Sequence, residues 1–192
     1  MEKVRKTKGK PSLESILFNT PEQKMLRFLL SEPTTSFTPR ILSSRLKGIR
    51  GLGGAEGIMS LLKKLEEVSL VQFLNNNREV SIQNDNLAVK MLKIVSSICD
   101  LEGVRELVEP ISTKGVLFGS RATGECRSDS NYNVFVVSDS TDSVRNVVER
   151  HPLGKKIELE VWTPDQYHLI DKKNSRLSTD LTSGIVMWGS SW

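Results

Sequence analysis

The residues best suited to chemistry lie in one stretch of the second half of the chain, between two apolar segments. Residues 115–118 and 134–137 are each expected to form a short buried strand, and the first runs directly into Gly119, Ser120 and Arg121. A glycine–serine turn at the start of a helix presents backbone N–H groups and a hydroxyl, which are the donors that hold a phosphate. The sequence therefore predicts a nucleotide- or phosphate-binding loop at these three residues.

The stretch from Gly119 to Asn133, which reads GSRATGECRSDSNYN, resembles the minimal nucleotidyltransferases, the small prokaryotic form of the polymerase-β superfamily. Their signature is a strand, Gly-Ser, an Arg-Ala/Gly-Gly-Glu stretch and Ser-Asp-x-Asp at the start of the next strand. The resemblance covers residues 111–192, in which residues 157–164 are similar to the third core strand and residues 184–189 to the closing strand. It implies a small mixed-sheet domain that transfers a nucleotide with the help of two Mg²⁺ ions held by carboxylates.

The sequence departs from that family at the residues that would hold the metal. Alternate residues of a strand share one face, so Asp-x-Asp places two carboxylates side by side, but here those positions are Asn131 and Asn133. An amide oxygen can bind a divalent cation but adds no charge, which leaves Glu158 or Glu160 as the remaining carboxylate. We therefore expect no metal site, no catalytic residue and no cofactor, with Mg²⁺ and ATP required only if activity is retained. The loop then either still holds a nucleotide or is a relic that binds nothing.

The first half of the chain is expected to contain helices closed by a β-hairpin. Helices are predicted to start at Thr20-Pro21 and Thr38-Pro39, because a capping residue precedes a proline in each first turn. Apolar residues at helical spacing predict a third helix over residues 55–68. Two short strands, residues 70–74 and 79–82, flank three asparagines, which tolerate the left-handed backbone of a tight hairpin turn.

This order of elements resembles the winged helix-turn-helix of MarR- and ArsR-like regulators, chiefly in the pattern of residues 37–42 and 61–67. The resemblance implies that the third helix enters the DNA major groove and that the hairpin contacts the backbone. The residues expected to contact DNA are Arg50, Ser60, Lys63, Lys64 and Arg78. Lys63 and Lys64 come late in the helix, where phosphate contact is favoured over base reading. A module for protein contact or dimerisation is the alternative for this half.

An apolar-rich segment joins the two halves. It predicts a long helix that begins near Asp85 or Asn86, followed by a further amphipathic piece at residues 101–108 before Pro110. The apolar stripe is broad enough to pack on both halves or on a second copy of the chain, so a homodimer is expected. The predicted α+β organisation is a basic disordered tail at 1–11, a winged helix-turn-helix at 12–84, connecting helices at 85–110 and a small mixed-sheet nucleotidyltransferase-like domain at 111–192.

Composition narrows the function classes. The 192 residues include 27 Lys and Arg against 23 Asp and Glu, and the net charge of +4 equals that of residues 1–10, which hold five basic groups and one acidic group. Such a tail can rest on phosphates. No segment approaches the roughly 20 apolar residues of a membrane span. The two cysteines have neither metal-ligand nor redox spacing, which fits a reducing cytoplasm.

These observations predict a cytoplasmic, DNA-binding transcriptional regulator whose second domain is catalytically degenerate and serves as a sensor, dimerisation or scaffold module. Duplex DNA and a second copy of the chain are the expected partners, with a nucleotide and another protein as further candidates and no membrane. One alternative is a working nucleotidyltransferase that modifies a protein, an RNA or a small molecule. The other is a non-catalytic, antitoxin-like interaction protein, which the resemblance implies because minimal nucleotidyltransferases often pair with helical toxin proteins.

Overall fold

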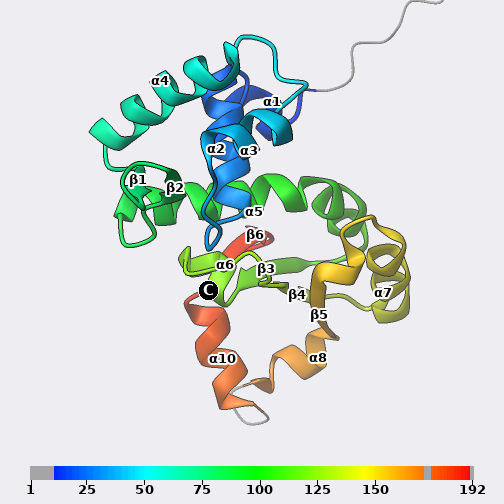
Figure 1. The fold of residues 1–192 in the computed structure, drawn as a ribbon. Coiled ribbons are helices and arrows are strands. Elements are labelled where there is room, and N and C mark those ends of the chain that lie inside the picture. The colour runs from blue at the N-terminus through cyan, green and yellow to red at the C-terminus, as the bar shows by residue number, and fades with distance from the viewer. Residues whose placement is uncertain (1–10, 171–173, 191–192) are drawn as a thin grey trace, which may run out of the picture.

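Two small β-sheets and a series of helices form the mixed α+β fold of the computed structural model, which describes residues 11–170 and 174–190 (Figure 1). The predicted basic tail falls almost wholly on residues 1–10, which lie outside the described residues. Helix α5 runs between the helices of the first half and the larger sheet of the second half (Figure 1). Within the described ranges, every helix is too short or too polar to cross a bilayer.

The first half follows the predicted order of elements, preceded by a short helix at Leu13–Leu17 that was not predicted. It consists of α1 (Leu13–Leu17), α2 (Pro21–Ser31), α3 (Pro39–Arg45), α4 (Gly54–Glu67), β1 (Val71–Leu74) and β2 (Glu79–Ile82). Both predicted helix starts are confirmed, because Thr20 forms a capping box with Gln23 and the Thr38 hydroxyl accepts a hydrogen bond from the third residue of α3. Asn75, Asn76 and Asn77 all have positive φ, as the hairpin turn requires.

The first core gathers one face from each of these elements except α1, which has no buried residue. Its fully buried members include Met25 and Leu29 of α2, Leu42 of α3, and Ile58 and Leu62 of α4, and both hairpin strands close it. An isolated bridge pairs Phe37 with Val80, so the segment before α3 lies along β2. The apolar spacing that predicted the helices therefore also predicts which faces they bury.

Helix α5 (Leu87–Val108) corrects the prediction of two consecutive helical pieces, because the structure joins them into one helix of 22 residues. No proline interrupts the segment before Pro110, and Gly103 remains helical. A Cβ atom on Gly103 would lie 3.1 Å from the Nε2 atom of His151, so glycine lets the neighbouring segment approach closely. The early part of α5, with Val89 and Cys99, belongs to the first core. The later part, with Leu101, Val104 and Val108, belongs to the second.

The second half is built on a four-stranded sheet of order β5-β4-β3-β6, in which the β4–β5 pair is parallel and the other two pairs are antiparallel. The strands are β3 (Lys114–Phe118), β4 (Tyr132–Val137), β5 (Ile157–Trp162) and β6 (Ile185–Trp188). The helices are α6 (Ser120–Thr123), α7 (Thr141–Arg150), α8 (Pro164–Tyr167) and α10 (Ser175–Thr182), with short 3₁₀ turns η1 (Glu109–Ile111) and η2 (Gly154–Lys156). All four predicted strands of this half are present.

The two faces of this sheet are covered by different helices. The face that carries Tyr132, Val134 and Val136 packs on α5 and α7. The opposite face, which carries Phe135 and Val137, packs on α10 and Ile170. Because side chains alternate along a strand, Asn133 shares the α10 face, whereas Tyr132 points to the α5 face.

Candidate functional site

The turn between β3 and α6 is shaped by Gly119. This residue has φ +71° and ψ −155°, a conformation that side-chain-bearing residues avoid. A Cβ atom here would lie 2.8 Å from the Nδ2 atom of Asn133, so the glycine also makes room for that amide. The Gly119 carbonyl accepts hydrogen bonds from the backbone of Ala122 and Thr123 and starts the short α6 turn. The loop thus brings Gly119 and Ser120 to the edge of the sheet where β3 ends and β4 begins.

Asn131, Asn133 and Glu158 gather at that same edge. The parallel register pairs Asn133 with Glu158, and the Asn131 Nδ2 atom donates to Glu158 Oε1 over 2.7 Å. Glu160 pairs with Phe135, further along the strand. Of the two carboxylates left open by the sequence, Glu158 is therefore the one beside the asparagines.

This donor set does not fit a pair of Mg²⁺ ions. A hard divalent cation is bound in proteins mainly by carboxylate oxygens, and here one carboxylate, Glu158, stands with two neutral amides. The amide nitrogen of Asn131, which points its hydrogen at Glu158, already occupies one of the carboxylate oxygens. Among the described residues, no group of three or more His, Cys, Asp and Glu side chains is placed to hold a metal ion.

Arg121, the third predicted phosphate ligand, is directed elsewhere. Its Nε and Nη2 atoms donate to the backbone carbonyl of Ser130 over 3.1 and 2.7 Å, and its guanidinium carbon lies 3.8 Å from the centre of the Tyr132 ring. Tyr132 belongs to the α5 face of the sheet, opposite the asparagines. A phosphate contact by Arg121 stays a prediction, and it would require the side chain to leave Ser130.

Tyr132, between the two asparagines, makes contacts that the sequence did not predict. Its Oη atom donates to Asp100 Oδ2 over 2.6 Å, and Asp100 Oδ1 accepts from Arg27 Nη2 over 2.5 Å. Burial, followed by the hydrogen bond to Asp100, raises the pKa of Tyr132 well above its usual range, so the hydroxyl stays protonated. A chain of polar contacts thus runs from α2 through α5 to β4 and the Arg121 side chain.

The loop that follows α6 also packs on the first half of the chain. A Cβ atom on Gly124 would lie 2.5 Å from the backbone oxygen of Lys90 in α5, so the two backbones are in close contact. The Lys90 ammonium pairs with Glu125 over 2.6 Å, which raises the pKa of Lys90 and lowers that of Glu125. The hydroxyls of Thr34 and Ser128 lie 3.0 Å apart. The loop that carries the predicted phosphate site therefore also forms contacts between the two halves.

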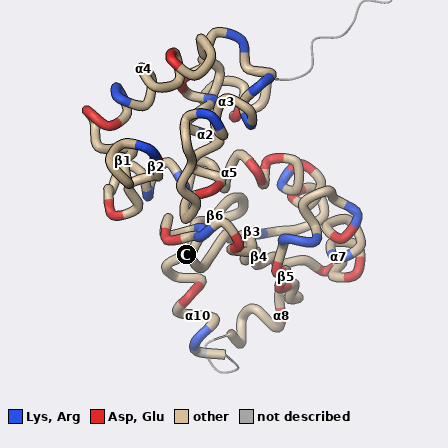
Figure 2. Tube along the Cα trace, in the orientation of Figure 1, with Lys and Arg blue, Asp and Glu red and all other residues tan. Residues whose placement is uncertain are grey.

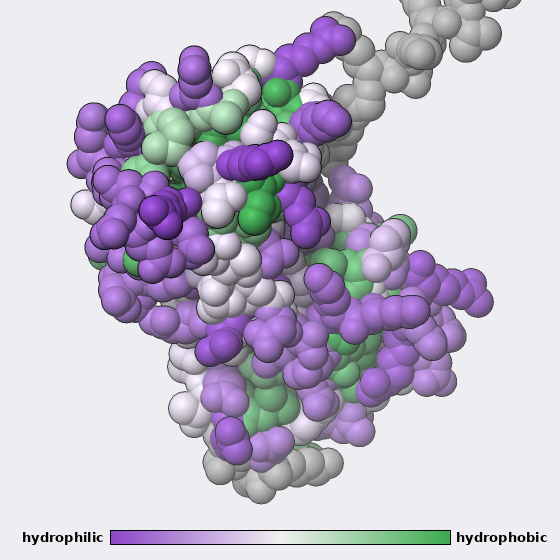
Figure 3. All heavy atoms as spheres, viewed as in Figure 1, coloured by the Kyte–Doolittle hydropathy of each residue, from purple (hydrophilic) through white to green (hydrophobic). Residues whose placement is uncertain are grey.

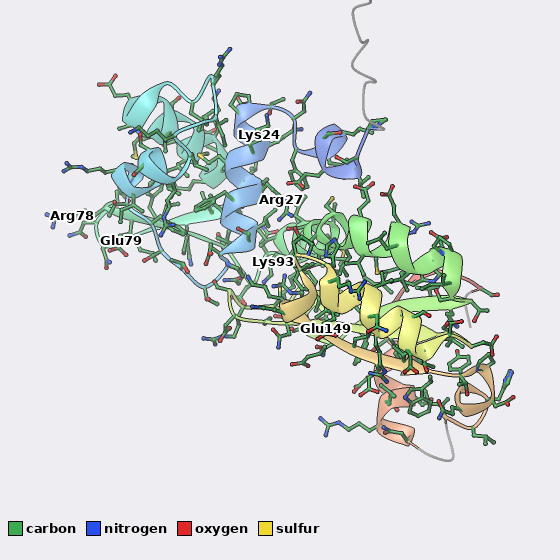
Figure 4. All side chains as sticks on the ribbon, turned by 90° about the vertical axis from the view of Figure 1, so that its right-hand side faces the viewer. Lys24, Arg27, Arg78, Glu79, Lys93 and Glu149 are labelled. Atoms are coloured by element: carbon green, nitrogen blue, oxygen red, sulfur yellow. The ribbon has the colours of Figure 1, made fainter. Side chains whose placement is uncertain are left out.

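The second candidate surface is the outer face of α4 together with the hairpin. Ser60, Lys63 and Lys64 are exposed on the side of α4 opposite its buried apolar stripe. Arg78 points away from the body of the molecule beside the hairpin turn (Figure 4), and Arg50 is exposed in the turn before α4. The five residues predicted to contact DNA are thus all accessible.

The charges on this surface are mixed. Helix α4 holds two lysines and three glutamates, and Figure 2 shows both signs along it. The exposed surface of the first half in Figure 3 is mostly hydrophilic, with small hydrophobic patches. At the start of α2, hydrogen bonds from the backbone N–H of Glu22 and from the Thr20 hydroxyl lower the pKa of Glu22. Lys64 lies nearby and lowers this pKa by a smaller amount.

Two further cations join this surface that the sequence analysis did not assign to it. Arg40 and Lys47 line a hollow of about 280 Å³ with Ser43 and Ser44 of α3 and with Ala55 of α4. Arg40 lies in the first turn of α3 and Lys47 in the turn that follows the helix, so the fold rather than helical spacing brings them to the same hollow. The positive charge next to the start of α4 therefore comes from Arg40 of α3 and from Lys47 and Arg50 between the two helices, rather than from α4 itself.

No protein-family model, curated protein or solved structure matches this chain.

Proposed function

We propose that the protein is a cytoplasmic DNA-binding regulator whose first half is a winged helix-turn-helix. In this proposal α4 enters the major groove and the β1–β2 hairpin rests on the backbone. The observation that supports it most is the exposed face of α4, where Ser60 and Lys63 are free of the core while Ile58, Leu61 and Leu62 anchor the opposite side. Arg78, beside the hairpin turn, extends the same accessible surface.

The distribution of charge favours contacts to phosphate over base reading. Lys63 and Lys64 lie in the later part of α4, and the base-facing early part offers Glu56, an acid that repels phosphate. Arg40 of α3 and Lys47 of the turn after it line a hollow beside Ala55 of α4 and add positive charge near the start of α4. We therefore expect binding with a strong dependence on salt and modest selectivity among sequences.

The second half is proposed to be a degenerate nucleotidyltransferase-like module that acts as scaffold or sensor. The replacement of two carboxylates by Asn131 and Asn133 argues against metal-dependent transfer. The contacts of the loop with Thr34 and Lys90 support a structural link between that loop and the first half. Three exposed apolar side chains on α5, Leu87, Met91 and Leu107, support a homodimer formed through this helix.

The proposal is tested by fluorescence anisotropy with duplex genomic fragments over a range of salt concentrations. A double variant, Lys63→Gln with Lys64→Gln, should weaken binding to all duplexes alike and reduce the slope of log K against log salt by about 2, because two phosphate contacts are lost. Arg78→Gln should reduce it by about 1.

The matched control is Lys155→Gln with Lys156→Gln, which removes the same charge from an exposed turn in the second half. Binding should be nearly unchanged in that variant. Equal losses in the two double variants would show that net charge alone drives association. If the unchanged protein does not bind any duplex even at low salt, the first half is a protein-contact module instead.

A further inference from the structure

A cavity of about 670 Å³ lies between α1, α2 and α5, and the segment that follows α3 lines another side of it. Its apolar walls are Phe18, Phe28, Leu46 and Ile49. Lys24 and Arg27 lie on the side of α2 that faces α1, above α5 (Figure 4). This size, with aromatic and aliphatic walls and a few convergent polar groups, is typical of sites for small molecules.

Arg27 has one donor that the described residues leave unsatisfied. Its Nη1 and Nη2 atoms donate to Ser96 and Asp100, but its Nε atom is buried and has no hydrogen-bond partner among the described residues. The Oε1 atom of Glu14 lies 3.5 Å away, which is too far for a good hydrogen bond. A buried donor in this state is costly, so an acceptor that reaches it gains free energy.

Glu14 is weakly held at the mouth of this cavity. Its side chain is 52% exposed, and the five-residue α1 that carries it has no buried residue. The segment is tied to α5 through the backbone N–H of Leu13, which donates to both carboxylate oxygens of Glu102. The Glu14 carboxylate can therefore swing into water without loss of a packed core.

We propose that this cavity binds a small molecule with an apolar, preferably aromatic, body and one carboxylate. The body packs on Phe18 and Phe28, and the carboxylate accepts a hydrogen bond from Arg27 Nε in place of Glu14. Lys24, at the same wall, adds a second positive charge. Asp100 does not repel the ligand strongly, because its charge is shared by Arg27 and by the Tyr132 hydroxyl. This proposal does not depend on DNA binding.

The test is ¹H–¹⁵N NMR on the full chain, which observes the Arg27 Nε–H group directly. Phenylacetate and octanoate serve as probes, and phenylacetamide is the neutral match of the first. Both anions should shift the Arg27 Nε–H signal and the amides of Phe18 and Phe28, and phenylacetamide should bind more weakly. Absence of these shifts with either anion at millimolar concentration would overturn the proposal.

Variants separate the proposed roles. Glu14→Gln removes the competing carboxylate and should tighten phenylacetate binding by about two- to fivefold, whereas Lys24→Gln should weaken it by a similar factor, as expected for partly exposed charges. Glu66→Gln, on the exposed surface of α4, removes one acid elsewhere and should leave the affinity unchanged. If Glu14→Gln weakens binding, Glu14 supports the site rather than competing for it, and the proposed displacement is wrong.

Discussion

The hydrogen bond between Tyr132 and Asp100 offers the most direct measurement of how the two halves are joined. Tyr132→Phe removes one hydroxyl and leaves the ring in place, because the ring is packed in the second core and lies beneath the Arg121 guanidinium. The Asp100 carboxylate keeps its contact with Arg27. The variant therefore removes the link from β4 to α5 without opening a cavity.

The expected loss follows from the burial of the two partners. A hydrogen bond to a charged group contributes about 1.5–3 kcal/mol. Tyr132 is only 4% exposed, but the Asp100 side chain is 27% exposed, so water can replace part of what the carboxylate loses. We expect the free energy of unfolding to fall by about 1–2 kcal/mol. In a chain of this length that corresponds to a decrease in Tm of about 2–8 °C.

Thermal and urea unfolding of four proteins measure this effect: the unchanged chain, Tyr132→Phe, Asp100→Ala and the double variant. Each variant loses part of the free energy of unfolding. The sum of the losses in the two single variants should exceed the loss in the double variant by about 1 kcal/mol, because either change removes the same hydrogen bond. Losses that add to within about 0.3–0.5 kcal/mol would refute the coupling. An unchanged Tm in Tyr132→Phe would refute it as well.

Three further predictions concern the asparagine pair, a helix start and a buried lysine. Asn131→Asp combined with Asn133→Asp places two more carboxylates beside Glu158, and their repulsion should lower the Tm measured by calorimetry in EDTA. Millimolar Mn²⁺ should restore the Tm by binding the carboxylates, and a Tm that does not change with Mn²⁺ would count against this geometry. Thr20→Ala removes the side-chain half of the capping box of α2 and should cost about 1 kcal/mol in urea unfolding, and no loss would mean that packing alone holds this helix start. Burial lowers the pKa of Lys93 in the folded protein below its ordinary value of 10.5. Between these two pKa values the unfolded chain binds more protons than the folded chain, so the free energy of unfolding increases as the pH rises through that window. When Tm is measured over a pH series, the Tm of the unchanged protein should rise relative to that of Lys93→Met as the pH approaches 10.5. A difference in Tm that stays constant with pH would contradict the lowered pKa of Lys93.

Local structure was predictable where one residue type decides it. The capping residues Thr20 and Thr38, each followed by proline, mark helix starts that the structure confirms within one turn. The three asparagines of the hairpin adopt the left-handed backbone that they tolerate better than most residues. These features depend on neighbours in sequence, so the sequence alone is sufficient for them.

The course of α5 shows where this reasoning fails. Its apolar residues do not form a single stripe, because its early part packs on one core and its later part on another. Periodicity along one face cannot represent a helix that changes partners. The sequence pattern therefore divided one helix into two.

The candidate phosphate loop was also predictable only in part. The positions of Gly119 and the asparagines beside the sheet edge follow from strand alternation and could be anticipated. The choice of Glu158 over Glu160 depends on the register between β4 and β5. The engagement of Arg121 with Tyr132 depends on contacts across the sheet, which carry no signal in spacing.

The amino-acid sequence was sufficient to predict the helix starts, the hairpin turn and the buried faces of the first half, and it shows neutral amides at Asn131 and Asn133. These are properties of residue type and short-range spacing. The hydrogen bond from Tyr132 to Asp100 and the place of Arg27 in a cavity wall beside α1 follow from the packing of the folded chain. Such contacts join residues far apart in the chain, and their geometry is set by how helices and sheet pack rather than by any local preference of the residues involved.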